Sequence, residues 1–246
     1  MTSGDNQSKM PKRLYLFHTG ANDSPSPYPV YLIQTNDGRN ILVDTGFPSE
    51  RYNDAASGEN DPEKIAAENH VVDQLATLGL SPHDVDILIS THFDGDHAGN
   101  NDAFPDAEIV VQREHFSWAQ GAERVAGVRS HWDKPGLDYR QIDGDVELRP
   151  GIKLIETSGH VPGHQSVLVT LPKTGNVLLA IDAVTHTGNR DAATRQMSQY
   201  DMDEPGIRAS TAKLAKLEQD ENVALTIYGH DRAQWDTLRH APEYYE

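Results

Sequence analysis

The stretch DILISTHFDGDHAGN, residues 86–100, joins a short apolar run to a dense cluster of polar side chains. The run DILIS is typical of a short buried strand. Two histidines and two aspartates then follow within six positions, from His92 to His97. Because imidazole and carboxylate groups both bind divalent metal ions, this spacing indicates a metal site where the strand ends.

Three other segments place a polar residue directly after an apolar strand. His160 follows KLIETSG, Asp182 follows NVLLAI, and His230 follows ALTIYG. Loops at strand ends often carry the ligand sites of α/β proteins, so we expect these segments to converge. Together they offer enough groups for two ions that share one bridging carboxylate. The candidate ligands of this dinuclear centre are His92, Asp94, Asp96, His97, His160, Asp182 and His230.

A calcium-binding loop is the main alternative for DGDHAGNND. Counted from Asp94, an EF-hand needs acidic or amide groups at the third and fifth positions, glycine at the sixth and glutamate at the twelfth. Asp96 and Gly99 fit, but the fifth position is Ala98 and the twelfth is Pro105. A single histidine or aspartate at a strand end is usually a cap or a solvated side chain. The metal hypothesis therefore depends on the four segments together.

Composition excludes several classes of function. The 246 residues carry a formal charge of −17, which disfavours nucleic acids, anionic membrane surfaces and strongly anionic substrates. There is no cysteine, so disulfides, thiolate nucleophiles and sulfur-ligated zinc are excluded. The polar start lacks the apolar core of a signal peptide, and no apolar run has membrane-spanning length, so the cytoplasm is the expected location. A small-molecule substrate is the expected partner, and the formation of a homodimer is left as a possibility.

The first half of the chain shows strands and then helices. RLYLFHTG (13–20) predicts a strand, and YPVYLIQTNDGRNILVDTG (28–46) predicts a hairpin that turns near Asn36 to Gly38. Apolar residues at helical spacing predict a helix over 61–80. AEIVVQ reads as a strand and REHFSWAQ as a helix. Residues 121–139 show little periodicity and are expected to form a loop or lid.

The second half repeats this order. VELRPGIKLIETSG, HQSVLVTLP and GNVLLAID are predicted strands, GIRASTAKLAKLEQDEN is a helix, and VALTIYGHD is a last strand. The predicted class is α/β: an αβ/βα sandwich of two mostly antiparallel or mixed sheets with helices outside. We expect a disordered tail over 1–13 and a single domain over 14–246.

The order of these motifs resembles the metallo-β-lactamase superfamily, whose signature is His-x-His-x-Asp-His followed by a histidine, an aspartate and a last histidine. The flanking sequences are similar to those of the N-acyl-homoserine lactonase family over residues 14–231. They are YPVYLIQTNDGRNILVDTGFP, HFDGDHAGNNDAFPDAEIVVQREHF, TSGHVPGHQSVLVT, VLLAIDAV and IYGHD. The resemblance implies the metallo-β-lactamase fold in a hydrolase domain.

The resemblance also implies two metal sites. Site one would comprise His92, Asp94 and His160, and site two Asp96, His97 and His230, with Asp182 bridging the ions. Zn²⁺ is the expected metal, and Mn²⁺ or Fe²⁺ are alternatives because Asp94 adds a hard anionic ligand. His164 is expected to orient a loop or pack against the site.

Two positions depart from the family pattern. Asp94 stands where the family usually has histidine, so the motif here is the variant His-x-Asp-x-Asp-His. Thr185 stands where the lactonases usually have a tyrosine that touches the substrate carbonyl, and the neighbouring His186 could replace it. Asp96 could also carry a proton to the leaving oxygen. Asp96, Thr185 and His186 are therefore the expected catalytic residues.

The implied reaction is opening of a lactone ring, that of an N-acyl-homoserine lactone in quorum quenching, by a hydroxide that bridges two metal ions. The alternatives are a metallo-hydrolase of another ester, lactone, thioester, β-lactam or phosphodiester, because one fold hosts several activities. A third alternative is a degenerate, non-catalytic member that binds a ligand or a metal without turning it over.

Overall fold

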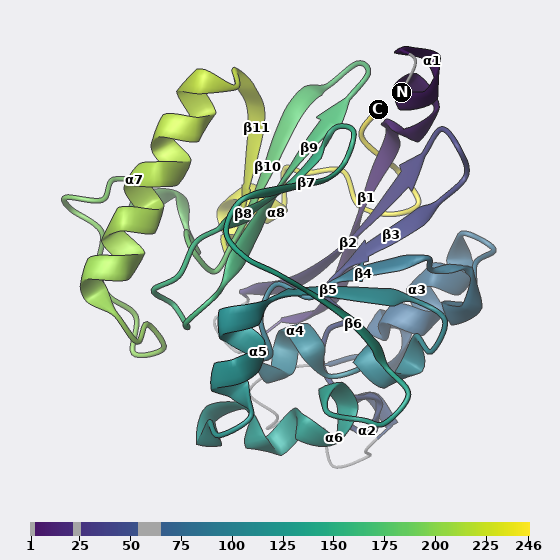
Figure 1. Ribbon diagram of the computed structural model, residues 1–246, viewed down its shortest axis with the longest axis horizontal. Coiled ribbons are helices and arrows are strands. Elements are labelled where there is room, and N and C mark those ends of the chain that lie inside the picture. The colour runs from purple at the N-terminus through teal and green to yellow at the C-terminus, as the bar shows by residue number, and fades with distance from the viewer. Residues whose placement is uncertain (1–2, 22–25, 54–64) are drawn as a thin grey trace.

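The computed structural model describes residues 3–21, 26–53 and 65–246. Two β-sheets face each other, and helices cover their outer surfaces (Figure 1). The predicted αβ/βα sandwich with two mixed sheets is therefore confirmed.

The first sheet has six strands in chain order. Its first three strands are antiparallel, and the pairs from β3 to β6 are parallel. Gly38, with φ +82°, turns the predicted hairpin between β2 and β3. The strands are β1 (Pro11–Ala21), β2 (Pro27–Thr35), β3 (Asn40–Val43), β4 (Ile87–Ile89), β5 (Glu108–Gln112) and β6 (Asp138–Ile142).

The second sheet has five strands in the order β11, β10, β9, β8, β7. Only β10 and β11 pair in parallel, and α7 (Glu204–Asp220) crosses over between them on the outer face (Figure 1). The strands are β7 (Val146–Arg149), β8 (Ile152–Glu156), β9 (Gln165–Leu171), β10 (Gly175–Ile181) and β11 (Val223–Tyr228).

The helices are short apart from α7, which spans Glu204–Asp220. The other α-helices are α1 (Ser3–Lys9), α2 (Ser49–Asn53), α3 (Val71–Thr77), α4 (Gly95–Ala98), α5 (Arg113–Ala119), α6 (Arg129–Trp132) and α8 (Arg232–Trp235). The 3₁₀ segments are η1 (Ala67–Asn69), η2 (Pro82–Asp84), η3 (Asn101–Ala103), η4 (Glu123–Val128) and η5 (Thr187–Asn189).

The main apolar core fills the space between the sheets. Alternate residues of the strands point into it, such as Tyr31 and Ile33 from β2 and Val167 and Val169 from β9. Each of these side chains is fully buried. The sandwich therefore holds the ends of strands from both sheets in fixed positions.

Three local expectations differ from the structure. Within 1–13, expected to be a disordered tail, residues 3–9 form α1 and residues 11–13 begin β1, while 1–2 lie outside the described residues; Asn36 Nδ2 donates to the Gln7 carbonyl. VELRPGIKLIE forms two strands rather than one, because Gly151 adopts φ +76° and reverses the chain. The single helix expected over 61–80 is replaced, within the described residues, by the 3₁₀ segment η1 and the shorter helix α3, and 61–64 lie outside them.

The loop or lid expected over 121–139 is largely ordered helix and strand. It contains η4, α6 and the start of β6. Val125, Val128 and Trp132 are buried, and the Trp132 ring stacks on Phe93 with the ring centroids 4.4 Å apart. The segment is therefore packed beside the loop that carries His92 to His97.

Candidate metal centre

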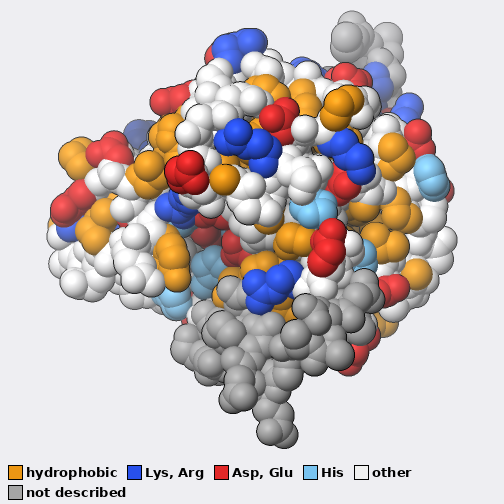
Figure 2. All heavy atoms as spheres, turned by 90° about the horizontal axis from the view of Figure 1, so that it is seen from below, with side chains coloured by type: hydrophobic (Ala, Val, Ile, Leu, Met, Phe, Trp, Pro, Cys, Tyr) orange, Lys and Arg blue, Asp and Glu red, His pale blue; other side chains and the backbone are white. Residues whose placement is uncertain are grey.

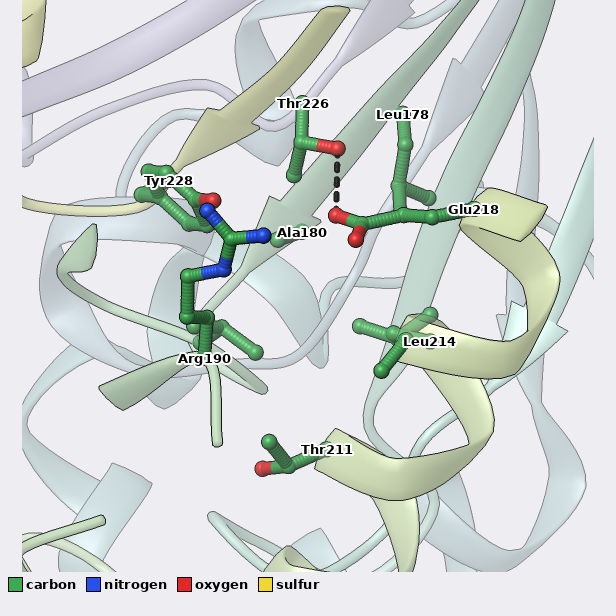
Figure 3. Close-up of a pocket in the computed structure, with 10 residues that line it drawn as sticks. Leu178, Ala180, Arg190, Thr211, Leu214, Glu218, Thr226 and Tyr228 are labelled. Carbon is green, nitrogen blue, oxygen red and sulfur yellow. Dashed lines mark hydrogen bonds between the residues drawn. The ribbon is translucent and has the colours of Figure 1, made fainter. Parts of the chain in front are cut away.

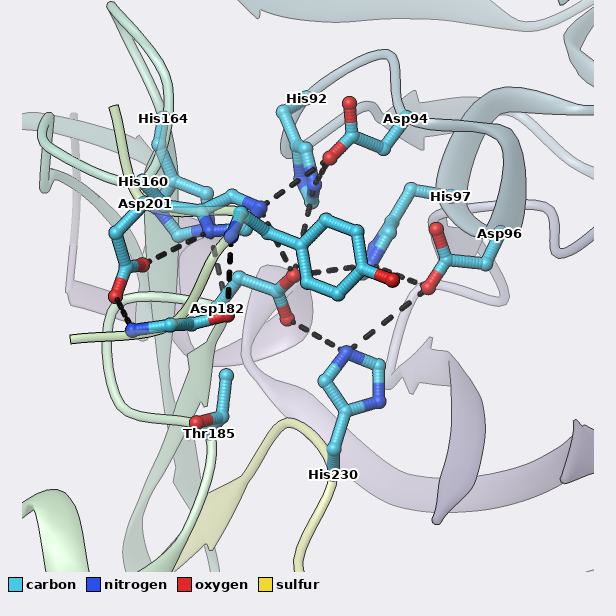
Figure 4. Close-up of polar contacts among 12 residues, drawn as sticks. His92, Asp94, Asp96, His97, His160, His164, Asp182, Thr185, Asp201 and His230 are labelled. Carbon is cyan, nitrogen blue, oxygen red and sulfur yellow. Dashed lines mark hydrogen bonds and ion pairs between the residues drawn. The ribbon is translucent and has the colours of Figure 1, made fainter. Parts of the chain in front are cut away.

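All seven candidate ligands meet at one end of the sandwich (Figure 4). His92 and Asp94 lie in the loop after β4, and Asp96 and His97 lie on α4, so sheet one supplies four of them. His160, Asp182 and His230 follow β8, β10 and β11 of sheet two. The convergence expected from the sequence is therefore present.

One cluster contains the residues expected for site one. His92 Nε2 lies 3.4 Å and His160 Nε2 lies 3.2 Å from Asp94 Oδ2. The same nitrogens lie 3.8 Å and 3.2 Å from Asp182 Oδ2. Ligand atoms of His92, Asp94 and His160 all fall within 4.8 Å of one another.

The second cluster contains the residues expected for site two. Asp96 Oδ2 lies 3.3 Å from His97 Nε2 and 3.9 Å from His230 Nε2. Asp182 reaches this cluster as well, with its Oδ2 3.7 Å from His97 Nε2 and its Oδ1 3.1 Å from His230 Nε2. Asp182 thus faces both clusters with its carboxylate.

These separations suit metal binding. Tetrahedral zinc with bonds of about 2.0–2.1 Å places its ligand atoms about 3.3 Å apart. In addition, His92 Nε2, His97 Nε2 and Asp182 Oδ1 are buried and make no hydrogen bond. Since buried polar atoms rarely stay unpaired, these three atoms fit the role of metal ligands.

The Nδ1 atom of each histidine is held by an oxygen. His97 Nδ1 donates to Asp44 Oδ2 at 2.8 Å, and His230 Nδ1 donates to the Pro27 carbonyl at 2.7 Å. His160 Nδ1 lies 3.2 Å from Asp201 Oδ1. His92 Nδ1 lies 3.0 Å from Thr91 Oγ1. Each contact fixes the tautomer that turns Nε2 toward the centre, which is how ligand histidines are commonly oriented.

Asp44 is a residue that the sequence analysis missed. Its side chain is fully buried, and it accepts from Thr91 N–H at 2.8 Å and from Thr91 Oγ1 at 2.7 Å. Because the Thr91 hydroxyl donates to Asp44, it must accept from His92. Asp44 therefore orients His92 and His97 together. It directly follows the apolar strand NILV, which is the same signal that pointed to the ligands.

His115 and Asp201 were also missed. His115 is fully buried on α5, where Nε2 accepts from Phe93 N–H and Nδ1 donates to the Pro162 carbonyl, both at 2.8 Å. Burial lowers the pKa of His115 to about 3, so its ring is neutral and can accept that bond. His115 thus joins the loop of His92 to that of His160, and no local sequence pattern marks it.

His164 contacts the backbone of the loop that carries Asp182. Its Nε2 accepts from the backbone N–H of Asp182 at 3.3 Å, and its Nδ1 lies 2.9 Å from Thr157 Oγ1. Burial, together with nearby His92 and His160, holds the pKa of His164 well below its ordinary value. The neutral ring supports the backbone next to the carboxylate that faces both clusters.

The carboxylates are ionised despite their burial. Burial alone would raise the pKa of Asp182, but His230, His160 and His97 hold it well below its usual range. Burial likewise opposes ionisation of Asp94, and the hydrogen bonds from Arg124 together with the close contacts of His160 and His92 outweigh it, so the pKa of Asp94 is well below the ordinary value. Both groups are therefore anionic at neutral pH.

Arg124 is a further residue that the sequence analysis missed. It lies in η4, and its guanidinium clasps Asp94: Nε donates to Oδ1 at 2.7 Å, and Nη2 donates to Oδ2. Nη2 also lies 2.9 Å from His160 Nε2. The segment expected to be a loop or lid thus places the Arg124 guanidinium beside Asp94 and His160. The low periodicity of this segment did not indicate that contact.

Thr185 and His186 lie beside the second cluster. The Thr185 carbonyl accepts from His230 N–H at 2.8 Å, and Thr185 Oγ1 lies 3.0 Å from His186 Nδ1. His186 is exposed, whereas Thr185 is half-buried. The pair is thus next to Asp182 and His230 in space, as Figure 4 shows for Thr185.

Three of the candidate ligands are partly exposed, with 15% of the side chain of Asp94, 19% of Asp96 and 15% of His230 accessible. Figure 2 shows acidic and histidine side chains gathered in a hollow on one face of the protein. Another pocket lies between α7 and strands β10 and β11, where Thr226 Oγ1 donates to Glu218 Oε1 at 2.6 Å (Figure 3). None of the described residues that line this second pocket is a candidate ligand.

Comparison with known proteins places the chain in a family. Residues 24–230 match the metallo-beta-lactamase superfamily model. The N-acyl homoserine lactonase AiiA of Bacillus thuringiensis subsp. kurstaki is 34% identical over an alignment that covers 94% of this chain and 95% of the relative. The chain belongs to the N-acyl homoserine lactonase family. The expected resemblance to this family within the superfamily is therefore confirmed.

Solved structures of the lactonase family agree with this assignment. A crystal structure of the quorum-quenching N-acyl homoserine lactone hydrolase has a TM-score of 0.85 at 31% identity and covers 97% of this chain and 100% of that one. A second structure holds the product N-hexanoyl-L-homoserine at its catalytic metal centre. It has a TM-score of 0.83 at 31% identity and covers 96% of this chain and all of that one. Membership in this family of enzymes, with the metal-ligand clusters in place, makes the chain a metal-dependent hydrolase of the lactonase type.

Proposed function

We propose that this protein opens the ring of N-acyl homoserine lactones. The observation that carries the proposal is the convergence of seven His and Asp side chains in a chain of the lactonase family. The substrate class comes from relatives that are named for it and match nearly the whole chain. A neutral lactone also suits a protein of formal charge −17, since no charge repulsion opposes its approach.

We propose the following ligand roles. His92, Asp94 and His160 hold one divalent ion, Asp96, His97 and His230 hold the other, and Asp182 is shared. The near-tetrahedral spacing of these atoms and the fixed Nδ1 partners support this division. Two ions, most simply Zn²⁺, would supply Lewis acidity toward the ring carbonyl and an activated water at neutral pH.

The remaining roles belong to side chains around the clusters. Asp96 would carry a proton to the ring oxygen as it leaves; its side chain is 19% exposed and can face the substrate. Thr185 and His186, which contact each other next to His230, would bind the lactone where the lactonases usually have tyrosine. A donor directed at the carbonyl oxygen stabilises the negative charge that develops during ring opening.

The decisive experiment couples metal analysis to a substrate panel. The purified protein, grown with added zinc, is expected to contain about two ions per chain and to open N-acyl homoserine lactones over a series of acyl chain lengths. A β-lactam, a thioester, a phosphodiester and a simple ester on the same preparation give the other hydrolase activities. Two bound ions without opening of any lactone would refute the proposal.

The same assay separates the proposed catalytic roles from ligand roles. Asp96→Asn should lose most activity and weaken metal binding. Thr185→Val and His186→Ala should keep the metal content and lower kcat/KM by about tenfold for whichever side chain binds the carbonyl. Unchanged kcat/KM in both variants would exclude this pair from substrate binding.

A further inference from the structure

Arg124 forms hydrogen bonds with two candidate ligand atoms of site one. Its Nη2 donates both to Asp94 Oδ2 and to His160 Nε2, the latter at 2.9 Å. Asp94 and His160 are the two ligands that face each other across that cluster, with Oδ2 and Nε2 3.2 Å apart. The guanidinium thus binds between the ligand atoms that a metal ion at site one would require.

The His160 contact excludes simultaneous metal binding. Arg124 Nη2 can only donate, so His160 Nε2 accepts this bond with its single lone pair, and Nδ1, which lies 3.2 Å from Asp201 Oδ1, donates to that carboxylate. That lone pair can accept from Arg124 or bind a metal ion, but it cannot do both. Metal at site one therefore requires that Nη2 leave His160.

At site two, no hydrogen-bond donor occupies the ligand nitrogen of His97. His97 Nε2 is buried, makes no hydrogen bond and faces Asp96 Oδ2 at 3.3 Å. His97 Nδ1 is already held by Asp44 at 2.8 Å, so the ring does not have to reorient. An ion can bind here without breaking a hydrogen bond of His97.

We propose that Arg124 is a built-in competitor for site one, which makes the two metal ions bind in order: site two first and tightly, site one second and more weakly. The inference rests on the proposed metal sites of the lactonase. It also gives a reason for Asp94, because the carboxylate anchors the guanidinium through two hydrogen bonds that a histidine at this position could not accept. When the second ion enters, Nε of Arg124 can keep its 2.7 Å bond to Asp94 Oδ1 while Nη2 withdraws from His160.

Arg124 is well placed for this task. Its Nη1 donates to the carbonyl of Tyr200, next to Asp201, which orients His160. Its backbone lies in η4, whose residues Val125 and Val128 are buried. The guanidinium is thus held on both sides, and its departure from His160 costs a hydrogen bond that is charge-assisted.

The test is a zinc titration of metal-free protein in competition with a chelating dye. The native protein should bind two ions in separate steps, the second about tenfold or more weaker than the first, since a hydrogen bond from a charged group must be broken. Arg124→Gln should tighten the second step by about tenfold and leave the first unchanged. Arg113→Gln, which removes an exposed arginine paired with Asp143, is the matched control and should leave both steps as in the native protein.

Two further variants assign the steps to sites. His230→Ala should remove the tight step, and His160→Ala should remove the weak one. Two native steps of equal affinity would overturn the inference even if lactones are opened, and this result needs no variant to fold. An unchanged second step in folded Arg124→Gln would overturn it as well. A native protein that binds no zinc would instead refute the proposed function, and the inference with it.

Discussion

Each histidine of the centre uses both of its ring nitrogens. The Nδ1 atoms are bound to Asp44, Thr91, Asp201 and the Pro27 carbonyl, and the Nε2 atoms face the carboxylates. An imidazole held in this way loses little rotational freedom when it binds a metal ion, and its tautomer is already correct. The oxygens behind the ligands therefore decide the geometry as much as the ligands themselves.

Asp44 gives the sharpest test of this point. Asp44→Asn would put an amide where one carboxylate now accepts from Thr91 N–H, Thr91 Oγ1 and His97 Nδ1. Zinc affinity should fall by about 10- to 100-fold, as is usual when such a supporting carboxylate is lost. The measurement is the same dye competition. Asp220→Asn, at the exposed end of α7, is the control and should bind zinc like the native protein.

At the scale of elements, strand ends bring the site together. Strands β10 and β11 run in parallel, so Asp182 and His230 leave the sheet at the same edge. Ile181 adopts φ +51°, a conformation that is costly for a β-branched residue and that turns the chain at Asp182. Gly229 lies directly against this turn: a Cβ at that position would lie 2.6 Å from the Ile181 carbonyl and 2.8 Å from Asp182 Oδ1.

Gly229→Ala should therefore damage the centre without removing any ligand. The added methyl group collides with backbone on one side and with the shared carboxylate on the other, so Asp182 must shift. We expect loss of at least one bound ion and a fall in thermal stability. Gly188→Ala is the matched control, because a Cβ there has nothing within 4 Å. Native zinc content in Gly229→Ala would contradict this prediction, because it would mean that the turn accommodates the methyl group.

At the scale of the whole molecule, the centre links the two sheets. His92, Asp94, Asp96 and His97 belong to sheet one, and His160, Asp182 and His230 belong to sheet two. Ions bound between them would tie the halves of the sandwich together at one end. Among the described residues, no helix is long and apolar enough to cross a membrane.

Metal removal should consequently lower the melting temperature. A ligand that binds only the folded state at about 1,000 times its Kd stabilises by about 4 kcal/mol, which corresponds to on the order of 10 °C for a chain of this size. The measurement is a thermal scan before and after chelation, followed by zinc addition. Asp182→Asn, which weakens both sites, should show a much smaller shift. A melting temperature that is independent of metal would contradict a link between the sheets.

The sequence by itself determined the parts of this protein that follow local rules. Alternating apolar residues set most of the strands, and turn residues such as Gly38 set the first hairpin. The polar residues after those strands indicated the seven candidate ligands, because strand ends are where such side chains can converge. The order of the motifs indicated the metallo-β-lactamase superfamily, and the flanking sequences indicated the lactonase family.

Only the tertiary structure decided the contacts that join distant segments. Arg124 meets Asp94 and His160, and Asp44 meets His97, across 30 to 53 positions of the chain, and no periodicity records such contacts. The segment expected to be a loop contains η4, which packs against Phe93 and Trp132 and carries Arg124. Strand periodicity reports which face of an element is buried, whereas the partner of a charged side chain depends on which loops the sandwich brings side by side. For this reason Asp94 could be recognised as unusual from the sequence, but its partner became visible only in the fold.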